Sequence, residues 1–215
     1  MNCQKCYNKR DKTNLGKEVE KMNKTVDARG LACPKPVILT KKELENIESG
    51  SVTTLVDNEI AVKNLEKLAS SLGYEVAYSG SENAFEVVIT VGEGSTETVV
   101  QEGLVNQTIV LGTNIMGSGS EELGKTLMKG FIYTLTETKP YPKTILCYNS
   151  GVLLTSEGSD SIDDLKKLSE AGVEILSCGT CLNYFGLGEK LLVGEVTNMY
   201  TIVEKMKEAE NTIRI

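Results

Sequence analysis

Six cysteines and no histidine limit the chemistry that this sequence can perform. Cys33 directly precedes Pro34 in the stretch RGLACPKPVIL, and Cys178 and Cys181 form a Cys-x-x-Cys pair in LSCGTCLNYFGL. The absence of histidine excludes Ser–His and Cys–His hydrolases and metal sites that need imidazole. Any catalysis must therefore use cysteines, carboxylates, lysines or hydroxyls, and a reactive thiolate is the leading candidate.

Two prolines indicate how Cys33 is positioned. Proline is tolerated in the first turn of a helix because the N–H groups there have no intrahelical acceptor. Pro34 and Pro36 therefore predict a helix over residues 34–47, with Cys33 at its cap. The positive end of the helix dipole would then favour the thiolate. The alternative interpretation is a small buried side chain, which cysteine often is.

The Cys178–Cys181 pair follows an apolar segment and has several interpretations. A thioredoxin-type redox pair normally follows the first strands of its domain, not the last. Half of a zinc site would need two more ligands, and the other Cys-x-x-Cys, Cys3 and Cys6, is too distant for a zinc ribbon. A pair that handles sulfur or selenium and a structural turn with incidental thiols remain. Cys147 lies in an apolar strand, and we expect it in the core, with an approach to Cys178 as the alternative.

Composition argues against several partners. The net charge is −7, and no long basic stripe is present, which argues against nucleic acid and anionic membranes. No apolar run approaches the roughly 18 residues of a transmembrane helix. The first 21 residues lack the hydrophobic region of a secretory signal. We therefore predict a cytoplasmic protein with reduced thiols and with no metal, bound cofactor, nucleic-acid or membrane partner.

The chain divides into two predicted domains. Residues 1–21 are charged and poor in apolar residues, which predicts a disordered tail, and we expect translation to begin at Met22. Residues 22–91 alternate strand and helix patterns in the order βαβαββ, which predicts a small two-layer α/β sandwich. Residues 92–105 are polar and contain glycine, as linkers do.

Residues 106–206 predict a three-layer α/β domain with a parallel sheet, and residues 207–215 a C-terminal tail. The expected strands are 107–114, 143–152 and 172–178, and the expected helices are 120–137, 160–171 and 197–210. Ligand sites of such sheets lie beyond the carboxyl ends of the strands. The residues expected near that edge are Asn114, Asn149, Ser150 and Cys178.

The segment Gly119–Thr126 satisfies the pattern of a nucleotide-binding P-loop. A phosphate cradle needs a glycine-rich loop of inward N–H groups, whereas this segment carries two glutamates that repel phosphate. Ser118 followed by Glu121 resembles a helix capping box, so Gly124 and Lys125 are expected inside a helix. We therefore predict no nucleotide site.

The stretch DARGLACPKPVILTKKEL resembles the signature of the TusA-like (SirA-like) sulfur-carrier family, and the resemblance covers residues 24–91. The Cys-Pro-x-Pro motif of that family matches Cys33-Pro34-Lys35-Pro36, with Arg29 and Gly30 before it. The resemblance implies that Cys33 carries sulfur as a persulfide. The sequence DNEIA after the second strand departs from many relatives, which have a proline there.

Three further stretches resemble a DsrE-like domain: IVLGTNIMGSGSEELGKTLMKGF, YNSGV and CGTCLNYFGL followed by VGEVTNMY. A DsrE-like domain follows a TusA-like domain in the YedF proteins, whose order this chain shares. The resemblance implies a sulfurtransferase-like protein associated with selenium metabolism. It also implies self-association through the DsrE-like domain.

These observations together predict a carrier of persulfide sulfur or reduced selenium. The expected partners are a cysteine desulfurase or another donor and the thiols of acceptor proteins. The expected site comprises Cys33, Cys178 and Cys181, and the only group carried is a transient adduct on cysteine. The alternatives are a regulatory scaffold without turnover and a Cys-x-x-Cys thiol–disulfide oxidoreductase.

Overall fold

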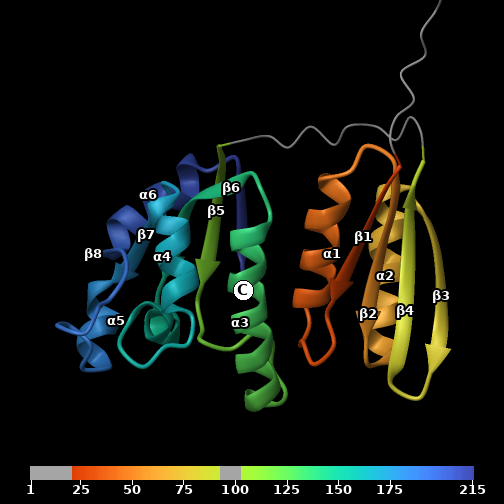
Figure 1. The fold of residues 1–215 in the computed structure, drawn as a ribbon. Helices are drawn as coiled ribbons and strands as arrows, with labels where there is room; N and C mark the ends of the chain where they lie inside the picture. Colours follow the sequence, from red (N-terminus) through yellow and green to blue (C-terminus); the bar gives the residue numbers. More distant parts are fainter. Residues whose placement is uncertain (1–20, 93–102) are drawn as a thin grey trace, which may run out of the picture. The chain divides into compact units, whose positions relative to one another are not determined.

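The computed structural model of the protein describes residues 21–92 and 103–215 (Figure 1). Each of these ranges forms its own β-sheet, and we refer to them as the first unit and the second unit. The predictions for the tail, for Cys3 and Cys6 and for most of the linker fall outside the described residues. Among the helices of the described ranges, none combines the length and the apolar character needed to span a membrane.

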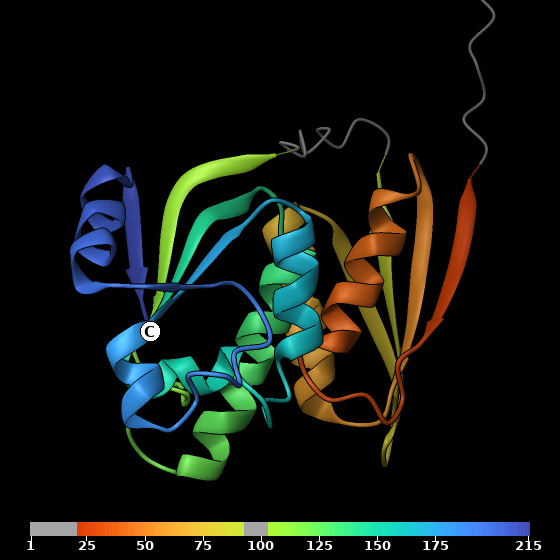
Figure 2. The ribbon, with the colours of Figure 1, turned by 90° about the vertical axis from the view of Figure 1, so that its left-hand side faces the viewer.

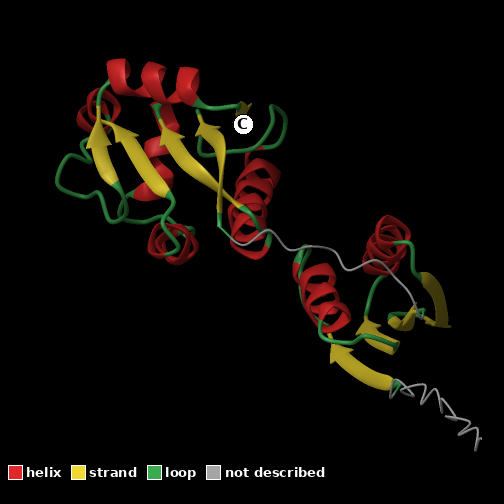
Figure 3. Ribbon diagram, turned by 90° about the horizontal axis from the view of Figure 1, so that it is seen from above, coloured by secondary structure: helices red, strands yellow, loops and turns green. Residues whose placement is uncertain are grey.

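The first unit is a two-layer sandwich. Its elements are β1 (Met22–Asp27), α1 (Lys35–Glu45), β2 (Gly50–Val56), α2 (Glu59–Leu72), β3 (Glu75–Ser81) and β4 (Ala84–Val91). The strands lie in the order β1-β2-β4-β3, with β1 and β2 parallel and both pairs that involve β4 antiparallel. Both helices of this unit lie on one face of its sheet (Figure 3). This confirms the predicted βαβαββ sandwich.

The alternation of buried and half-buried side chains shows that one face of the first sheet is covered. Along β2, buried and half-buried side chains alternate, as they do when one face packs on helices. Val52 and Val56 are fully buried, as is Leu65 on α2. Burying side chains of this size contributes roughly 1.5–3 kcal/mol each. The Asn58 side chain caps α2 by accepting a backbone N–H at 2.8 Å, and the helix ends at Gly73, with φ 70°.

The second unit has three layers. Its elements are β5 (Leu104–Leu111), α3 (Glu121–Glu137), β6 (Tyr141–Cys147), the 3₁₀-helix η1 (Asn149–Thr155), α4 (Ile162–Glu170), β7 (Glu174–Cys178), α5 (Gly179–Tyr184), β8 (Glu195–Thr197), α6 (Met199–Glu208) and β9 (Asn211–Arg214). The strands are parallel, in the order β8-β7-β6-β5-β9. Figure 2 shows α3 and α4 on one face of this sheet and α6 on the other.

Cover on both faces explains the composition of the central strands. β5, β6 and β7 end in runs of buried residues and do not alternate. Fully buried side chains such as Ile109, Ile145 and Leu146 form the core on these strands. The predicted parallel sheet of a three-layer α/β domain is confirmed.

The last residues of the chain belong to this sheet and not to a tail. β9 pairs in parallel with β5, and the N–H of Ile215 donates to the carbonyl oxygen of Val110 at 2.9 Å. All side chains of β9 are exposed. The strand is therefore held by backbone pairing and leaves no apolar pattern in the sequence. The C-terminal tail expected at residues 207–215 is wrong for this reason.

Candidate functional site

Cys33 lies in an exposed turn directly before α1. The N–H of Lys35 donates to the carbonyl oxygen of Ala32 at 3.1 Å, which closes this turn over Cys33 and Pro34. Because α1 begins at Lys35, one residue later than expected, Cys33 is not the cap residue that the sequence predicts. Pro36 occupies the first turn of the helix, as expected. The thiol is therefore accessible and sits beside the start of a helix.

Gly30 and Asp57 hold the segment that leads into this turn. Gly30 has φ 71°, a conformation that glycine adopts without a steric penalty. Its N–H donates to Asp57 Oδ2 at 2.6 Å, and the side chain of Asn58 donates to Asp57 Oδ1 at 2.8 Å. The hydrogen bond from Gly30 and then that from Asn58 lower the pKa of Asp57. Sequence reasoning missed Asp57, whose only signal was a polar residue at the end of a buried strand.

Arg29 is held by Asp27, the last residue of β1. Its Nε donates to Asp27 Oδ1 at 2.9 Å and its Nη2 to Asp27 Oδ2 at 2.6 Å. These hydrogen bonds lower the pKa of Asp27 to about 2. Since β1 and β2 are parallel neighbours, their carboxyl ends bring Asp27 and Asp57 to one edge of the sheet. Two aspartates therefore order the backbone on the approach to Cys33.

The Cys178–Cys181 pair lies at the carboxyl edge of the second sheet, as predicted for Cys178. Cys178 ends β7 and is only 2% exposed, whereas Cys181 lies on α5 and is partly exposed. The N–H of Asn149, which follows the neighbouring strand β6, donates to Cys181 Sγ at 3.0 Å. Asn149 has φ 51°, in the left-handed region that asparagine tolerates better than most residues.

Burial and the neighbouring Cys178 influence the protonation of Cys181. Burial raises the pKa of Cys181, a hydrogen bond with Cys178 raises it further, and the Asn149 N–H acts in the opposite direction. Cys181 is therefore mainly protonated at neutral pH. The hydrogen bond brings the two sulfur atoms together, as a disulfide or an exchange of sulfur requires.

Gly179, between these cysteines, lets α5 approach β8. A Cβ at this position would lie 3.0 Å from Val196 Cγ1 and 3.4 Å from the carbonyl oxygen of Thr197. A Cβ at this position therefore requires Val196 or the start of α5 to move by a few tenths of an ångström. Gly179 thus allows the close approach of α5 to β8 that places Cys178 and Cys181 on either side of it, a role that sequence reasoning did not assign.

Cys147 belongs to the core, as expected. It is fully buried on β6, and burial raises its pKa to about 12. A thiol with so little thiolate is a poor nucleophile. Within the described ranges, no group of three or more acidic or cysteine side chains is placed to hold a metal ion.

The segment that resembles a P-loop is mostly helical. The hydroxyl of Ser120 caps α3 by accepting the N–H of Leu123 at 3.3 Å. The capping box predicted at Ser118 is therefore wrong by two residues, because Ser120 directly precedes the first turn. Gly124 and Lys125 lie inside α3, as predicted. The backbone N–H groups of this segment thus serve the helix and do not form a phosphate cradle.

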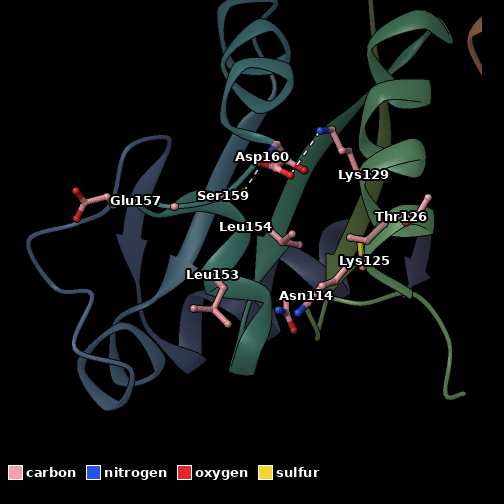
Figure 4. Close-up of a pocket in the computed structure, with 12 residues that line it drawn as sticks. Asn114, Lys125, Thr126, Lys129, Leu153, Leu154, Glu157, Ser159 and Asp160 are labelled. Carbon is pink, nitrogen blue, oxygen red and sulfur yellow. Dashed lines mark hydrogen bonds and ion pairs between the residues drawn. The ribbon is translucent and has the colours of Figure 1, made fainter. Parts of the chain in front are cut away.

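A cavity of about 610 Å³ lies beside α3 (Figure 4). Lys125 reaches from α3 toward Asn114, which follows β5. On another wall, Lys129 Nζ lies 3.6 Å from Asp160 Oδ2, and Leu154 adds apolar surface. Among the described residues that line this cavity, none is a cysteine.

Family comparisons match both units. Residues 24–91 match the family described as Sulfurtransferase TusA, and residues 144–215 match the DsrE/DsrF-like family. The chain is 37% identical over 68 residues to the protein MJ0990 of Methanocaldococcus jannaschii, a match that covers 31% of this chain and 91% of that protein. The chain therefore belongs to the TusA family through its first unit and joins it to a DsrE-like second unit, the architecture predicted from the sequence.

Two relatives from Bacillus subtilis are longer than the region that they share with this chain. YrkF is 36% identical over 64 residues, which cover 29% of this chain and 34% of YrkF. YrkI is 41% identical over 44 residues, which cover 20% of this chain and 59% of YrkI. These two and MJ0990 are all named, provisionally, as sulfur carrier proteins.

Two solved structures each resemble a part of the chain. The SirA-like protein from Desulfitobacterium hafniense is 44% identical, with a TM-score of 0.31, over 33% of this chain and 99% of that one. The ychN protein from Escherichia coli is 16% identical, with a TM-score of 0.39, over 54% of this chain and 100% of that one.

Proposed function

We propose that this protein carries sulfane sulfur on Cys33 and passes it to other thiols. The observation that carries the proposal is the exposed Cys33 thiol in a turn that Gly30 and Asp57 hold in place. A donor such as a cysteine desulfurase loads this thiol as a persulfide, Cys33–S–SH. Relatives of the first unit that are named, provisionally, as sulfur carriers support this role.

The acceptor inside the protein is Cys181, of the same chain or of a second copy. The Cys181 thiolate attacks the outer sulfur of the persulfide, the bond between the two sulfurs breaks, and the Cys33 thiolate leaves. The Asn149 N–H, 3.0 Å from Cys181 Sγ, stabilises the attacking thiolate. A thiolate leaves readily without a general acid, so the step needs no histidine.

The same exchange would carry selenium held as a Cys33–S–SeH adduct, in which selenium has the oxidation level of sulfane sulfur; the resemblance to YedF proteins implies selenium as a cargo. The final acceptors in this proposal are thiols of other proteins. The protein would act in the cytoplasm, where thiols are kept reduced. It also includes self-association through the second unit, which would let Cys33 of one copy reach Cys181 of another. No resident cofactor takes part in these steps.

Loading by a cysteine desulfurase with sulfur-labelled cysteine tests the proposal. We expect wild-type protein to gain label on the Cys33 peptide, Cys33→Ser to gain none from the desulfurase, and Cys181→Ser to load but not pass the label on. A Cys33→Ser protein that loads as well as wild type would refute the assignment. A scaffold would neither accept nor pass on label.

A thiol–disulfide oxidoreductase is the second candidate, because Cys178 and Cys181 pair a buried thiol with a partly exposed one. Such an enzyme would reduce insulin at a rate that depends on this pair and not on Cys33. The carrier function predicts instead that loading with sulfur depends on Cys33 and not on this pair. Insulin reduction by Cys33→Ser and Cys178→Ser proteins therefore separates the two functions.

A further inference from the structure

The two cysteines at the edge of the second sheet are unequal. Cys178 is 2% exposed, ends a central strand and precedes the first residue of α5. Cys181, three residues later, is partly exposed and accepts the Asn149 N–H at 3.0 Å. A partner protein can therefore reach Cys181 but not Cys178.

Burial of Cys178 restricts what it can react with. Its thiol is hydrogen-bonded to Cys181, so the sulfur atom of Cys181 is the electrophile within its reach. When Cys181 carries a persulfide, that sulfur atom becomes the inner sulfur of the persulfide, and the outer sulfur is left to the exposed side. Cys178 thus faces the inner sulfur, and an outside thiol meets the outer one.

Two neighbouring elements keep the pair in this arrangement. Gly179 leaves no room between α5 and β8, since a Cβ there would lie 3.0 Å from Val196 Cγ1. The Asn149 N–H holds Cys181 from the side of β6. The pair occupies the position before a helix and the third position inside it, a separation that a disulfide can bridge.

We propose that Cys178 releases the sulfur carried on Cys181 as sulfide, so that the second unit reduces the persulfide that it receives. The inference rests on the proposed function, which supplies the persulfide on Cys181. It adds a second activity, in which the cargo leaves as a small reduced molecule and not only as a protein persulfide.

The reaction balances without another reagent: Cys181–S–SH and Cys178–SH give a Cys178–S–S–Cys181 disulfide and H₂S. The bond from Cys178 Sγ to Cys181 Sγ forms, and the bond from Cys181 Sγ to the outer sulfur breaks. The outer sulfur takes up two electrons and leaves as hydrosulfide, with the Cys178 proton retained in the H₂S. The two cysteines are oxidised to a disulfide, and a dithiol reductant restores them for the next cycle.

Direct loading of Cys181 tests this step apart from the carrier function. Full-length Cys33→Ser protein is treated with inorganic polysulfide, separated from excess reagent, and incubated without reductant. Sulfide is trapped with a bimane reagent, and the peptide that contains Cys178 and Cys181 is mapped by mass spectrometry. We expect one sulfide per disulfide formed between these cysteines.

Second-site variants of the same protein decide the outcome. Adding Cys178→Ser should leave the extra sulfur on Cys181 and slow sulfide release at least about tenfold. Cys178→Ala should behave in the same way, which separates loss of the thiol from a packing effect of serine. Adding Cys147→Ala, which removes a buried thiol that the reaction does not use, should leave release unchanged.

Three results would overturn the inference. They are unchanged release in both Cys178 variants, release without the disulfide, and failure of polysulfide to load Cys181. Since polysulfide bypasses Cys33, a failure of the desulfurase to load Cys33 would refute the carrier function and leave this result standing.

Discussion

Replacing Gly30 with alanine tests whether the backbone before Cys33 makes its thiol a good acceptor. Gly30 has φ +71°, and no heavy atom lies within 4 Å of the place that a Cβ would take. Alanine therefore meets no clash, and its cost is conformational alone. A left-handed backbone costs a residue with a Cβ roughly 1–2 kcal/mol.

Gly73 provides a matched control in the same unit. Its φ is +70°, no heavy atom lies within 4 Å of a Cβ built there, and it ends α2. Gly73 lies at the opposite end of α2 from Asp57, which accepts the N–H of Gly30 at 2.6 Å. Gly30→Ala and Gly73→Ala should therefore cost similar stability, and only the first should disturb the turn.

Hydrogen exchange and loading rates separate the two effects. Exchange of β2 peptides should report a loss of about 1–2 kcal/mol in the free energy of unfolding of the first unit for both variants. If this strain opens the Cys33 turn, loading by a desulfurase should slow about 5–30-fold in Gly30→Ala only. Equal loading rates with equal losses of stability would refute the reasoning, because the turn would then be irrelevant to loading.

Three further predictions concern the second unit. Transfer from Cys33 to Cys181 should accelerate about tenfold per pH unit between about pH 7 and 8. The reason is that burial and the hydrogen bond with Cys178 raise the pKa of Cys181 above that of an ordinary thiol, so its thiolate is the minor form throughout this range. A plateau of the transfer rate within this range, followed by stopped flow, would contradict the prediction. Asn149→Gly keeps the N–H and tolerates φ 51°, so transfer should match wild type. Asn149→Val resists that conformation by roughly 1–3 kcal/mol and should transfer about 5–150-fold more slowly, and equal rates in the two variants would count against the role of this N–H. Magnesium-ATP should leave the melting temperature unchanged because Gly119–Thr126 is mostly helical, whereas a rise with ATP concentration would show binding.

Much of the fold follows from periodicity and end signals in the sequence. Buried strands with helices between them predict the parallel sheet, and Gly73 correctly marks the end of α2. Elements without an apolar pattern escape this reasoning. β9 is a four-residue strand with exposed side chains that backbone pairing holds, and α5 is a six-residue helix that begins inside the Cys-x-x-Cys pair. Neither is long enough to show a period.

The candidate site was predictable in its cysteines and in the position of Asn149 at the sheet edge, and not in the contacts that support the thiols. Parallel topology alone places the end of β7 beside the end of β6, so Cys178 was expected at that edge. The partners of the reactive groups depend on contacts between distant residues. The hydrogen bond between Gly30 and Asp57 joins residues 27 positions apart in the sequence, and the one between Asn149 and Cys181 joins residues 32 positions apart. Cys33 lies in the turn before the helix and not at its cap, and the hydrogen bond from the Lys35 N–H to Ala32 that closes this turn is not specified by the proline pattern.

A time course of labelled sulfur tests the central claim most directly. Wild-type protein is loaded briefly by a cysteine desulfurase, the donor is removed, and the label on the Cys33 and Cys181 peptides is followed. The account predicts that label appears first on Cys33 and then moves to Cys181 as Cys33 loses it. Label that reaches Cys181 at the same rate in Cys33→Ser protein, or that never leaves Cys33, would contradict it.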